Sequence, residues 1–299
     1  MLTHLISSPI QPARVVILGA NGFVARALAA KLAASQTPVL AISSQELDLT
    51  SPTAGKTLAS RLQSTDSVVM TAALTPEKGR DTATLIKNLQ MAEQVANALA
   101  IQPCAHLVYF SSDAVYDWSQ PEINESIPAA PGDLYGVMHL ARELALSQAA
   151  GRQRIPFCIL RPCAIYGAGD THNSYGPNRF LRTALNEGKI KLFGDGEETR
   201  DHIFIDDITS LTIQVLNYCS TGTLNLVSGQ SVTFAQLATN IKRLTGGAVE
   251  TESLPRSGPV THRRFDCTSL KCAFPAHVPI PLDTGLTQTI AELSRNQSP

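Results

Sequence analysis

The sequence lacks any long hydrophobic run, because none of its apolar stretches approaches the ~18 consecutive residues of a membrane-spanning helix. It also lacks an excess of charge of either sign: 24 Lys and Arg stand against 25 Asp and Glu, which gives a formal net charge of -1. Such a balance creates no general field that attracts nucleic acid or anionic lipid. We therefore expect neither nucleic acid nor membrane as a partner, and any bound anion needs a local site.

Paired metal-ligand motifs and the features of a signal peptide are not found either. None of the six cysteines stands in a C-x-x-C pair, and no His/Cys cluster has the spacing of zinc ligands, so we expect no metal. Residues 1–12 lack the basic start and the long apolar stretch of a signal peptide, which indicates an N-terminal tail. Reduced thiols and a cytoplasmic location are the expectations that follow.

What the first half does contain is a regular alternation of short apolar runs with helical stretches. The expected strands are residues 14–18, 38–42, 67–71, 106–110 and 157–160, and the expected helices are 24–35, 52–62, 81–99 and 134–149. Strands that are apolar on both faces and alternate with helices are typical of a buried parallel sheet covered by helices on both sides. The fold class predicted is α/β, a Rossmann-type doubly wound parallel sheet.

The second half is less regular and predicts a smaller α/β substrate-binding lobe. Its expected elements are helices 180–187, 207–218 and 234–244, a strand pair at 190–193 and 203–205, and a strand at 222–227. Thr233 is a plausible cap for the helix that follows it. The predicted dinucleotide-binding domain takes residues 13–167 and about 203–228. The predicted lobe takes about 168–202 and 229–299.

A glycine-bearing turn, GANGFVA at residues 19–25, lies between the first strand and the first helix. Glycines there allow a tight turn and a close approach to a diphosphate, while the helix N-terminus supplies N–H groups and a positive dipole end. Ala25 replaces the usual third glycine and is small enough for close helix–strand packing. The predicted dinucleotide contacts from this turn are Gly19, Asn21, Gly22, Phe23 and Val24.

The residues at the end of the second strand do not distinguish NAD from NADP. A carboxylate usually meets the ribose of NAD there, but this chain has Ile42-Ser43-Ser44, and no arginine follows that would accept the 2′-phosphate of NADP. Asp48 and Leu49 come next, either in a plain helix-initiating turn or as adenine contacts. The expected cofactor is NAD or NADP, with Ser43, Asp48 and Leu49 as candidate contacts.

Further motifs follow in a fixed order along the chain. They are Ala72-Ala73, Ser111-Ser112-Asp113-Ala114-Val115-Tyr116, Tyr135-x-x-x-His139, Arg161-Pro162-Cys163-Ala164-Ile165-Tyr166-Gly167, and the segment from Gly194-Asp195-Gly196 to Asp207. Together with the glycine turn, they give a chain that resembles the extended short-chain dehydrogenase/reductases of the NAD-dependent epimerase/dehydratase family. The resemblance covers roughly residues 14–293.

The resemblance implies roles for individual residues. In the family a tyrosine moves the proton at the reacting oxygen, a serine or threonine hydrogen-bonds that oxygen, and a lysine one helical turn on lowers the pKa of the tyrosine. Tyr135 and Ser112 match the first two roles, but His139 takes the lysine position. An imidazole is mostly neutral at pH 7, although it can still hydrogen-bond the nicotinamide ribose. The implied cofactor contacts are Ala72, Ala73, Asn88, Tyr135 and His139.

The substrate implied by the resemblance is a nucleotide diphosphate sugar. Arginine suits its phosphates because the planar guanidinium binds phosphate oxygens with fixed geometry. The candidate substrate contacts are Asp113, Asn178, Arg200 and Arg256. A homodimer formed through the helices at 81–99 and 134–149 is implied in the same way.

Three reactions or roles compete. Ala114 stands where sugar-nucleotide dehydratases carry a glutamate, which disfavours dehydration. An NAD(P)-dependent epimerase fits best, and an NAD(P)H-dependent 4-keto-sugar-nucleotide reductase is the first alternative. A non-catalytic dinucleotide-binding regulator is the second, and His139 is the argument for it. If His139 is neutral, we expect reduction to be less impaired than oxidation, because reduction asks Tyr135 only to donate a proton.

Overall fold

A seven-stranded sheet forms the centre of the computed structural model, which describes residues 2–256 and 258–295. Its strands are β1 (Thr3–His4), β2 (Arg14–Leu18), β3 (Val39–Ile42), β4 (Asp66–Met70), β5 (His106–Phe110), β6 (Phe157–Pro162) and β10 (Ser220–Leu226), in the order β1-β10-β6-β5-β4-β2-β3. All neighbouring strands run parallel except β1, which is antiparallel to β10. The predicted parallel sheet is therefore confirmed.

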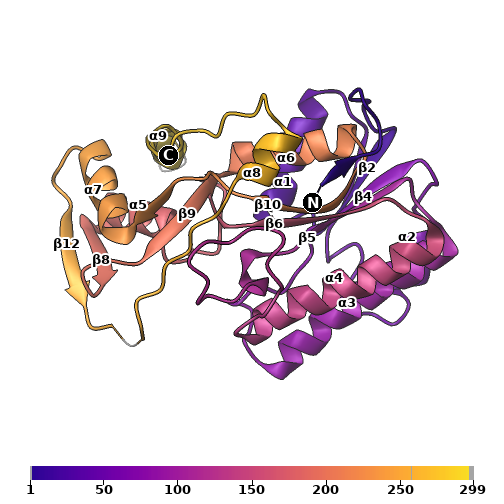
Figure 1. Cartoon of the computed structure of the whole chain (residues 1–299), viewed down its shortest axis with the longest axis horizontal. Helices are drawn as coiled ribbons and strands as arrows, with labels where there is room; N and C mark the ends of the chain where they lie inside the picture. The colour runs from indigo at the N-terminus through magenta and orange to yellow at the C-terminus, as the bar shows by residue number, and fades with distance from the viewer. Residues whose placement is uncertain (1, 257, 296–299) are drawn as a thin grey trace.

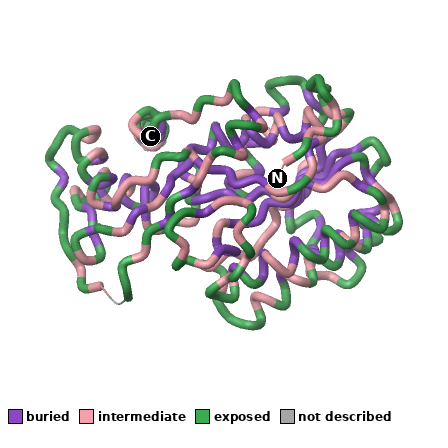
Figure 2. The backbone as a smooth tube through the Cα atoms, in the orientation of Figure 1, coloured by how far each residue is buried: buried purple, intermediate pink, exposed green. Residues whose placement is uncertain are grey.

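Helices cover both faces of this sheet (Figure 1). The helices α1 (Phe23–Ala34) and α6 (Ile205–Asn217) lie on one face, and α2 (Ala54–Ala59), α3 (Thr82–Ile101) and α4 (Leu134–Gln153) lie on the other. Successive residues of β2 pack on opposite faces of the sheet. Val15 lies in one core cluster with Leu28 of α1, and Val16 lies in the other with Val95 of α3. Figure 2 shows the buried residues concentrated along the strands. This is the doubly wound arrangement expected from the sequence.

A smaller lobe lies beside one end of the sheet (Figure 1, left). Its elements are β7 (Ala164–Tyr166), α5 (Pro177–Glu187), β8 (Lys189–Phe193), β9 (Thr199–Phe204), β11 (Ser231–Thr233), α7 (Phe234–Leu244) and β12 (Glu250–Leu254). They form a sheet of order β11-β9-β7 and a two-stranded sheet of β12 and β8. The cap predicted at Thr233 is confirmed, because its side chain accepts from the Gln236 backbone in a capping box.

Three segments differ from the expectations. The predicted pairing of residues 190–193 with 203–205 is wrong: β8 pairs in parallel with β12, and β9 pairs with β7 and β11. The polar sequence of β12, Glu-Thr-Glu-Ser-Leu, gave no strand signal because most of the strand is exposed. Within the expected N-terminal tail, β1 adds an edge to the main sheet. The helix α8 (Thr268–Ala273) packs on β10, whereas α9 (Leu282–Arg295) packs on α7 and β9.

The chain order of the strands fixes where a ligand can enter. After β2 the chain forms β3 on one side and then β4 on the other, and parallel sheets bind ligands at the carboxyl ends of strands at such a switch point. Gly19 follows β2 with φ +98°, and a Cβ there would stand 2.8 Å from the Ala72 backbone beyond β4. Only glycine allows this close approach of the two strand ends.

A second glycine controls how α4 meets the short 3-10 helix η1 (Asp113–Val115). A Cβ on Gly136 would lie 2.1 Å from the carbonyl oxygen of Ala114. The Gly136 amide also donates to the Asp133 side chain, 2.8 Å away, which caps α4. The first turn of α4 can therefore press directly against η1.

This contact predicts opposite effects for two glycine substitutions in the same helix. Gly136→Ala forces α4 away from η1 and should lower the free energy of unfolding by about 1–3 kcal/mol, as overpacking does. Gly151→Ala is the matched control, because a Cβ there meets nothing within 4 Å. It should raise that free energy by up to about 1 kcal/mol, since alanine favours helix more than glycine. Denaturant unfolding of both variants measures the difference, and equal effects would contradict this account of the packing.

Candidate functional site

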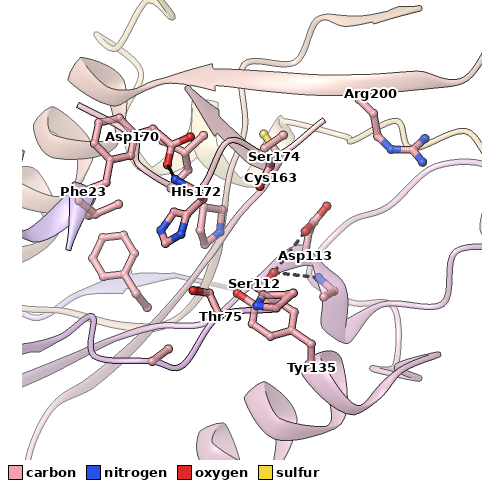
Figure 3. A pocket seen from close by; sticks show the side chains of 18 of the residues that line it. Phe23, Thr75, Ser112, Asp113, Tyr135, Cys163, Asp170, His172, Ser174 and Arg200 are labelled. Atoms are coloured by element: carbon pink, nitrogen blue, oxygen red, sulfur yellow. Dashed lines mark hydrogen bonds between the residues drawn. The ribbon is translucent and has the colours of Figure 1, made fainter. Parts of the chain in front are cut away.

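A cavity of about 540 Å³ opens between the carboxyl edge of the main sheet and the small lobe. Figure 3 shows Phe23 on one side of it, Arg200 on the opposite side, and Ser112 and Tyr135 between them. Its volume lies within the ~300–1,000 Å³ usual for small-molecule sites. Of the predicted site residues, the cavity is lined by Gly22, Phe23, Val24, Ala73, Ser112, Asp113, Tyr135, His139, Asn178 and Arg200.

The end of the cavity near α1 suits an anion. The helix begins after Gly22 with no side-chain cap and no acidic residue in its first turn, so its first N–H groups are available. A Cβ on Gly22 would meet only the Gly19 carbonyl, at 3.2 Å, and would otherwise extend into open space. The residues present therefore fit the diphosphate of a dinucleotide.

Other predicted cofactor residues lie outside the cavity lining and have structural contacts. The Ala72 carbonyl accepts a hydrogen bond from Arg142 at 2.7 Å, and the Asn21 carbonyl accepts one from Arg26. The Asn88 amide bonds both backbone groups of Leu74, at 2.9 and 3.0 Å, and so fixes the loop that follows β4. These residues shape the walls behind the cavity.

The end of β3 carries a carboxylate that the sequence analysis missed. Both the backbone N–H and the hydroxyl of Ser43 donate to Glu46, each at 2.8 Å. Asp48 instead accepts from the backbone and hydroxyl of Thr50, at 2.9 and 2.8 Å, in a local turn that ends before the Thr53 N-cap of α2. Leu49 is buried in the core. An acid four residues beyond Ile42, the last residue of β3, was the available signal for Glu46.

Tyr135 and Ser112 lie together on the floor of the cavity (Figure 3). Tyr135 comes from the first turn of α4, and Ser112 precedes η1 at the end of β5. The Ser112 hydroxyl accepts from the Ala114 amide at 3.1 Å and lies 3.3 Å from the Asp113 carboxylate. Burial raises the pKa of Tyr135 and the Asp113 carboxylate raises it further, whereas a hydrogen bond with Ser112 lowers it.

His139 is almost completely buried and neutral. Burial lowers the pKa of its imidazole well below the ordinary value, and the Arg142 cation lowers it further. Its Nδ1 lies 2.7 Å from the Tyr109 hydroxyl, and its ring meets the Tyr135 ring edge-on with centroids 4.6 Å apart. If the Tyr109 hydroxyl donates to Nδ1, then Nδ1 carries no proton. The single N–H of the neutral imidazole is then on Nε2.

The Nε2 atom of His139 is buried without a hydrogen-bond partner in the described part of the chain. An unpaired buried N–H is costly, so a ligand hydroxyl in the cavity that His139 lines would satisfy it. This observation fits the ribose contact that the resemblance implies. Because burial and Arg142 lower the pKa of this imidazole, the ring adds no positive charge there at neutral pH.

The predicted substrate arginines are placed differently. Arg200 lines the cavity and donates to the Thr261 backbone and hydroxyl at 2.7 and 2.8 Å. Arg256 does not line it, and its guanidinium pairs with Glu197 at 2.6 Å and Glu198 at 3.2 Å. To reach the cavity, Arg256 would have to leave both carboxylates.

Arg263 is a cavity residue that sequence reasoning missed. It forms an ion pair with Asp113, and its guanidinium lies 3.7 Å from the centre of the Trp118 ring. The only sequence signal was the basic pair Arg263-Arg264 in an otherwise irregular segment. Asn178 also lines the cavity, but its amide is held by the Gly167 N–H at 3.0 Å and by Asp170.

The described residues carry neither a metal cluster nor a membrane helix. Between residues 2 and 295, residue 257 excepted, no group of three or more His, Cys, Asp or Glu side chains could hold a metal ion. No helix within those same ranges is long and apolar enough to cross a membrane.

The fold and the Tyr135–Ser112 pair define a class of protein. The chain belongs to the NAD dependent epimerase/dehydratase family, whose family model matches residues 15–226. Among curated proteins it is similar to the UDP-glucose 4-epimerase of Mycolicibacterium smegmatis, with 27% identity over 179 residues. That match covers 58% of this chain and 57% of the relative, so it spans less than two thirds of that protein's length.

Solved structures show the same fold over almost the whole chain. The Thermus thermophilus UDP-glucose 4-epimerase in complex with NAD has a TM-score of 0.84 at 17% identity, covering 95% of this chain and 100% of the other. RMD from Pseudomonas aeruginosa complexed with NADPH has a TM-score of 0.81 at 24% identity, covering 95% and 99%. The Rossmann-type fold with its lobe is thus shared with these proteins.

The neutral state of His139 predicts a pH dependence of stability. Folding lowers the pKa of this imidazole below its value of ~6.5 in the unfolded chain. The neutral ring therefore contributes fully to the free energy of unfolding above pH ~6.5. That contribution is lost as the pH falls below ~6.5, because the unfolded chain then takes up a proton that the folded chain does not. Replacing His139 with glutamine should make the free energy of unfolding fall less steeply with decreasing pH, by up to about 1.4 kcal/mol per pH unit. Denaturant unfolding between about pH 5 and 8 measures the slopes.

Comparing the wild type with His139→Gln separates the effect of His139 on the slope from the effects of the other buried histidines. Burial lowers the pKa of His106 to about 4 and that of His202 to about 3, and both are present in wild type and variant. Their contributions therefore cancel in the difference. Identical slopes in the two proteins would show that His139 is not held neutral by the fold.

Proposed function

We propose that the protein is an NAD(P)-dependent sugar-nucleotide epimerase, which oxidises and re-reduces one sugar carbon of a nucleotide diphosphate sugar. The observation that carries the proposal is the arrangement of one cavity. Tyr135 and Ser112 share its floor, the uncapped N-terminus of α1 lies at one end, and Arg200 lies at the other. A dinucleotide and a sugar nucleotide can meet at Tyr135 in this arrangement.

The chemistry assigned to the chain is proton transfer at the reacting oxygen. A bound nicotinamide would supply hydride acceptance from the sugar carbon and hydride return to its opposite face, with no net oxidation. Tyr135 takes the hydroxyl proton when the carbon is oxidised and returns it when the carbon is reduced. Ser112 hydrogen-bonds the same oxygen and fixes its distance from Tyr135.

Glu46 supports NAD rather than NADP. Its carboxylate lies at the end of β3, bonded to Ser43, which is where an acidic residue meets ribose hydroxyls in dinucleotide-binding folds. A carboxylate in that place also repels a 2′-phosphate. We propose that Gly22, Phe23 and Val24 hold the diphosphate, and that His139 Nε2 donates to the nicotinamide ribose.

A 4-keto-sugar-nucleotide reductase is the second candidate, and the pKa of Tyr135 favours it. Burial and Asp113 raise that pKa, so Tyr135 is protonated at neutral pH and ready to donate. A reduction needs only this donation, whereas an epimerase also needs the deprotonated form in its oxidation step. The two candidates use the same residues and differ in the net reaction.

We also propose the homodimer that the resemblance implies. Apolar side chains remain exposed on the outer helices, with Ile86 of α3 at 51%, Val137 of α4 at 39% and Leu144 of α4 at 66%. Exposed apolar side chains on neighbouring helices favour a covered interface. The cytoplasmic location remains a prediction that agrees with six free cysteines.

The proposed function predicts the outcome of a substrate panel. Purified protein with NAD should interconvert a UDP- or dTDP-sugar with its epimer, with NMR reading product stereochemistry. Tyr135→Phe should reduce the rate by at least about 100-fold, since it removes the group that moves the proton. Gly22→Val should abolish cofactor binding in a folded protein, because its side chain fills the space beside the α1 N-terminus.

The other outcomes of the panel are equally informative. Conversion of a 4-keto sugar nucleotide with NADH or NADPH, without epimerisation, would replace the epimerase by the reductase. Tight cofactor binding with no turnover of any panel member would identify a non-catalytic dinucleotide-binding protein. Unchanged cofactor affinity in folded Gly22→Val, by calorimetry, would remove the dinucleotide site itself.

Arg200 should contribute to sugar-nucleotide affinity and not to cofactor affinity. Arg200→Ala should weaken sugar-nucleotide binding by about 1.5–3 kcal/mol, roughly 10- to 150-fold, the scale of a charged hydrogen bond. Arg256→Ala is the comparison, because Arg256 pairs with Glu197 outside the cavity and must move to take part. Calorimetry with UDP measures both. Equal affinity in wild type and Arg200→Ala would exclude Arg200 from the site.

A further inference from the structure

Arg142 is a fully buried cation one helical turn beyond His139 on α4. Its guanidinium donates to the Ala72 carbonyl at 2.7 Å and to the Asn88 side-chain oxygen at 3.4 Å. It also lies over the ring of Tyr109, 5.1 Å from the centroid. Within residues 2–256 and 258–295 no carboxylate pairs with it, and its Nε has no partner.

The nearest acidic residue along the chain does not neutralise this charge. Glu143 pairs with Arg161 at 2.6 Å and accepts from the Ser111 hydroxyl at 2.5 Å. Burial lowers the pKa of Arg142, but a guanidinium begins so high that it stays protonated. A buried cation without a counter-ion costs several kcal/mol. The fold therefore retains a positive charge at a place where hydrophobic side chains would stabilise it more.

A continuous series of contacts joins Arg142 to the reacting tyrosine. Its guanidinium stacks on Tyr109, and the Tyr109 hydroxyl bonds His139 Nδ1 at 2.7 Å. The His139 ring then meets the Tyr135 ring edge-on, with centroids 4.6 Å apart and an interplanar angle of 87°. Tyr135 lines the cavity, whereas Arg142 is not among the residues that line it.

The other charged groups that act on Tyr135 oppose its ionisation. Asp113 of η1 and Glu77 of the loop after β4 both raise the pKa of Tyr135, and Arg142 lowers it. Asp113 and Glu77 each have a partner of their own, Arg263 and His172 respectively. Arg142 is thus a cation that lowers the pKa of Tyr135 and that pairs with no carboxylate in the described part of the chain.

We propose that Arg142 supplies the positive charge that neutral His139 does not, and that it acts as a positioning residue which stabilises the phenolate form of Tyr135. The proposal rests on the epimerase function for its oxidation step. In that step the Tyr135 phenolate takes the proton of the sugar hydroxyl, and the carbon–oxygen bond becomes a carbonyl. A bound oxidised nicotinamide would accept the hydride from that carbon. Tyr135 is neutral again once its phenol has formed.

A pair of variants separates charge from packing. Arg142→Met removes the cation and keeps an unbranched side chain beside Met70 and Met138, whose sulfur atoms lie 3.4 and 3.6 Å from the guanidinium. Arg142→Lys keeps the cation. Difluorotyrosine at position 135, whose phenol is more acidic than that of tyrosine, makes the titration readable by fluorine NMR between about pH 6 and 10.

The titration needs no turnover and decides the electrostatic part of the proposal. Arg142→Met should move the titration of the fluorinated Tyr135 to higher pH, and Arg142→Lys should restore most of the shift. An unchanged titration in folded Arg142→Met would overturn the proposal. Because no sugar nucleotide is added, this result stands whether or not the epimerase function holds.

Single-turnover kinetics then tests the consequence for catalysis. With unmodified Tyr135, Arg142→Met should slow oxidation of the sugar nucleotide at pH 7 by at least about tenfold and shift its pH profile upward, while reduction changes less than about threefold. Arg142→Lys should recover oxidation. Equal slowing in both directions at every pH, with no recovery in Arg142→Lys, would assign Arg142 a purely structural role.

Discussion

The contact between the first turn of α4 and η1 brings Tyr135 and Ser112 together, and the proposed active site depends on it. Tyr135 lies on α4, and Ser112 lies 23 residues earlier in the chain, directly before η1. They meet because Gly136 has no side chain to hold α4 away from the Ala114 carbonyl. Asp133 fixes the start of the helix at the same place. In the proposed reaction, the distance over which Tyr135 moves a proton therefore depends on a backbone contact.

The electrostatics of the site depend on a different constraint, which is burial. Burial keeps His139 neutral and raises the pKa of Tyr135, so both groups that a dehydrogenase would use are biased toward their uncharged forms. Arg142 is buried too, but a guanidinium resists deprotonation far more strongly than an imidazole. The same low dielectric that removes charge from His139 increases the influence of Arg142. With the role proposed for Arg142, a histidine in the usual lysine position is compatible with catalysis.

The features that the sequence predicted well are local in the chain. Residues 106–110 match β5 in both bounds, because a short run that is buried on both faces carries its own signal. The turn at Gly19 and Gly22 was found for a similar reason, since spacing and position between a strand and a helix are visible in a few residues. The predicted pairing of residues 190–193 with 203–205 failed because pairing depends on a distant partner, β12.

The sequence by itself determined the parallel sheet, the glycine turn, the Tyr135 and Ser112 candidates and the absence of a lysine at His139. Each follows from residue type and spacing within one element. Only the tertiary structure decided that Glu46 holds the end of β3, that Arg263 enters the cavity while Arg256 pairs outside it, and that Arg142 is buried without a carboxylate. Their roles depend on neighbours contributed by other elements, and side-chain type alone does not distinguish a surface arginine from a buried one.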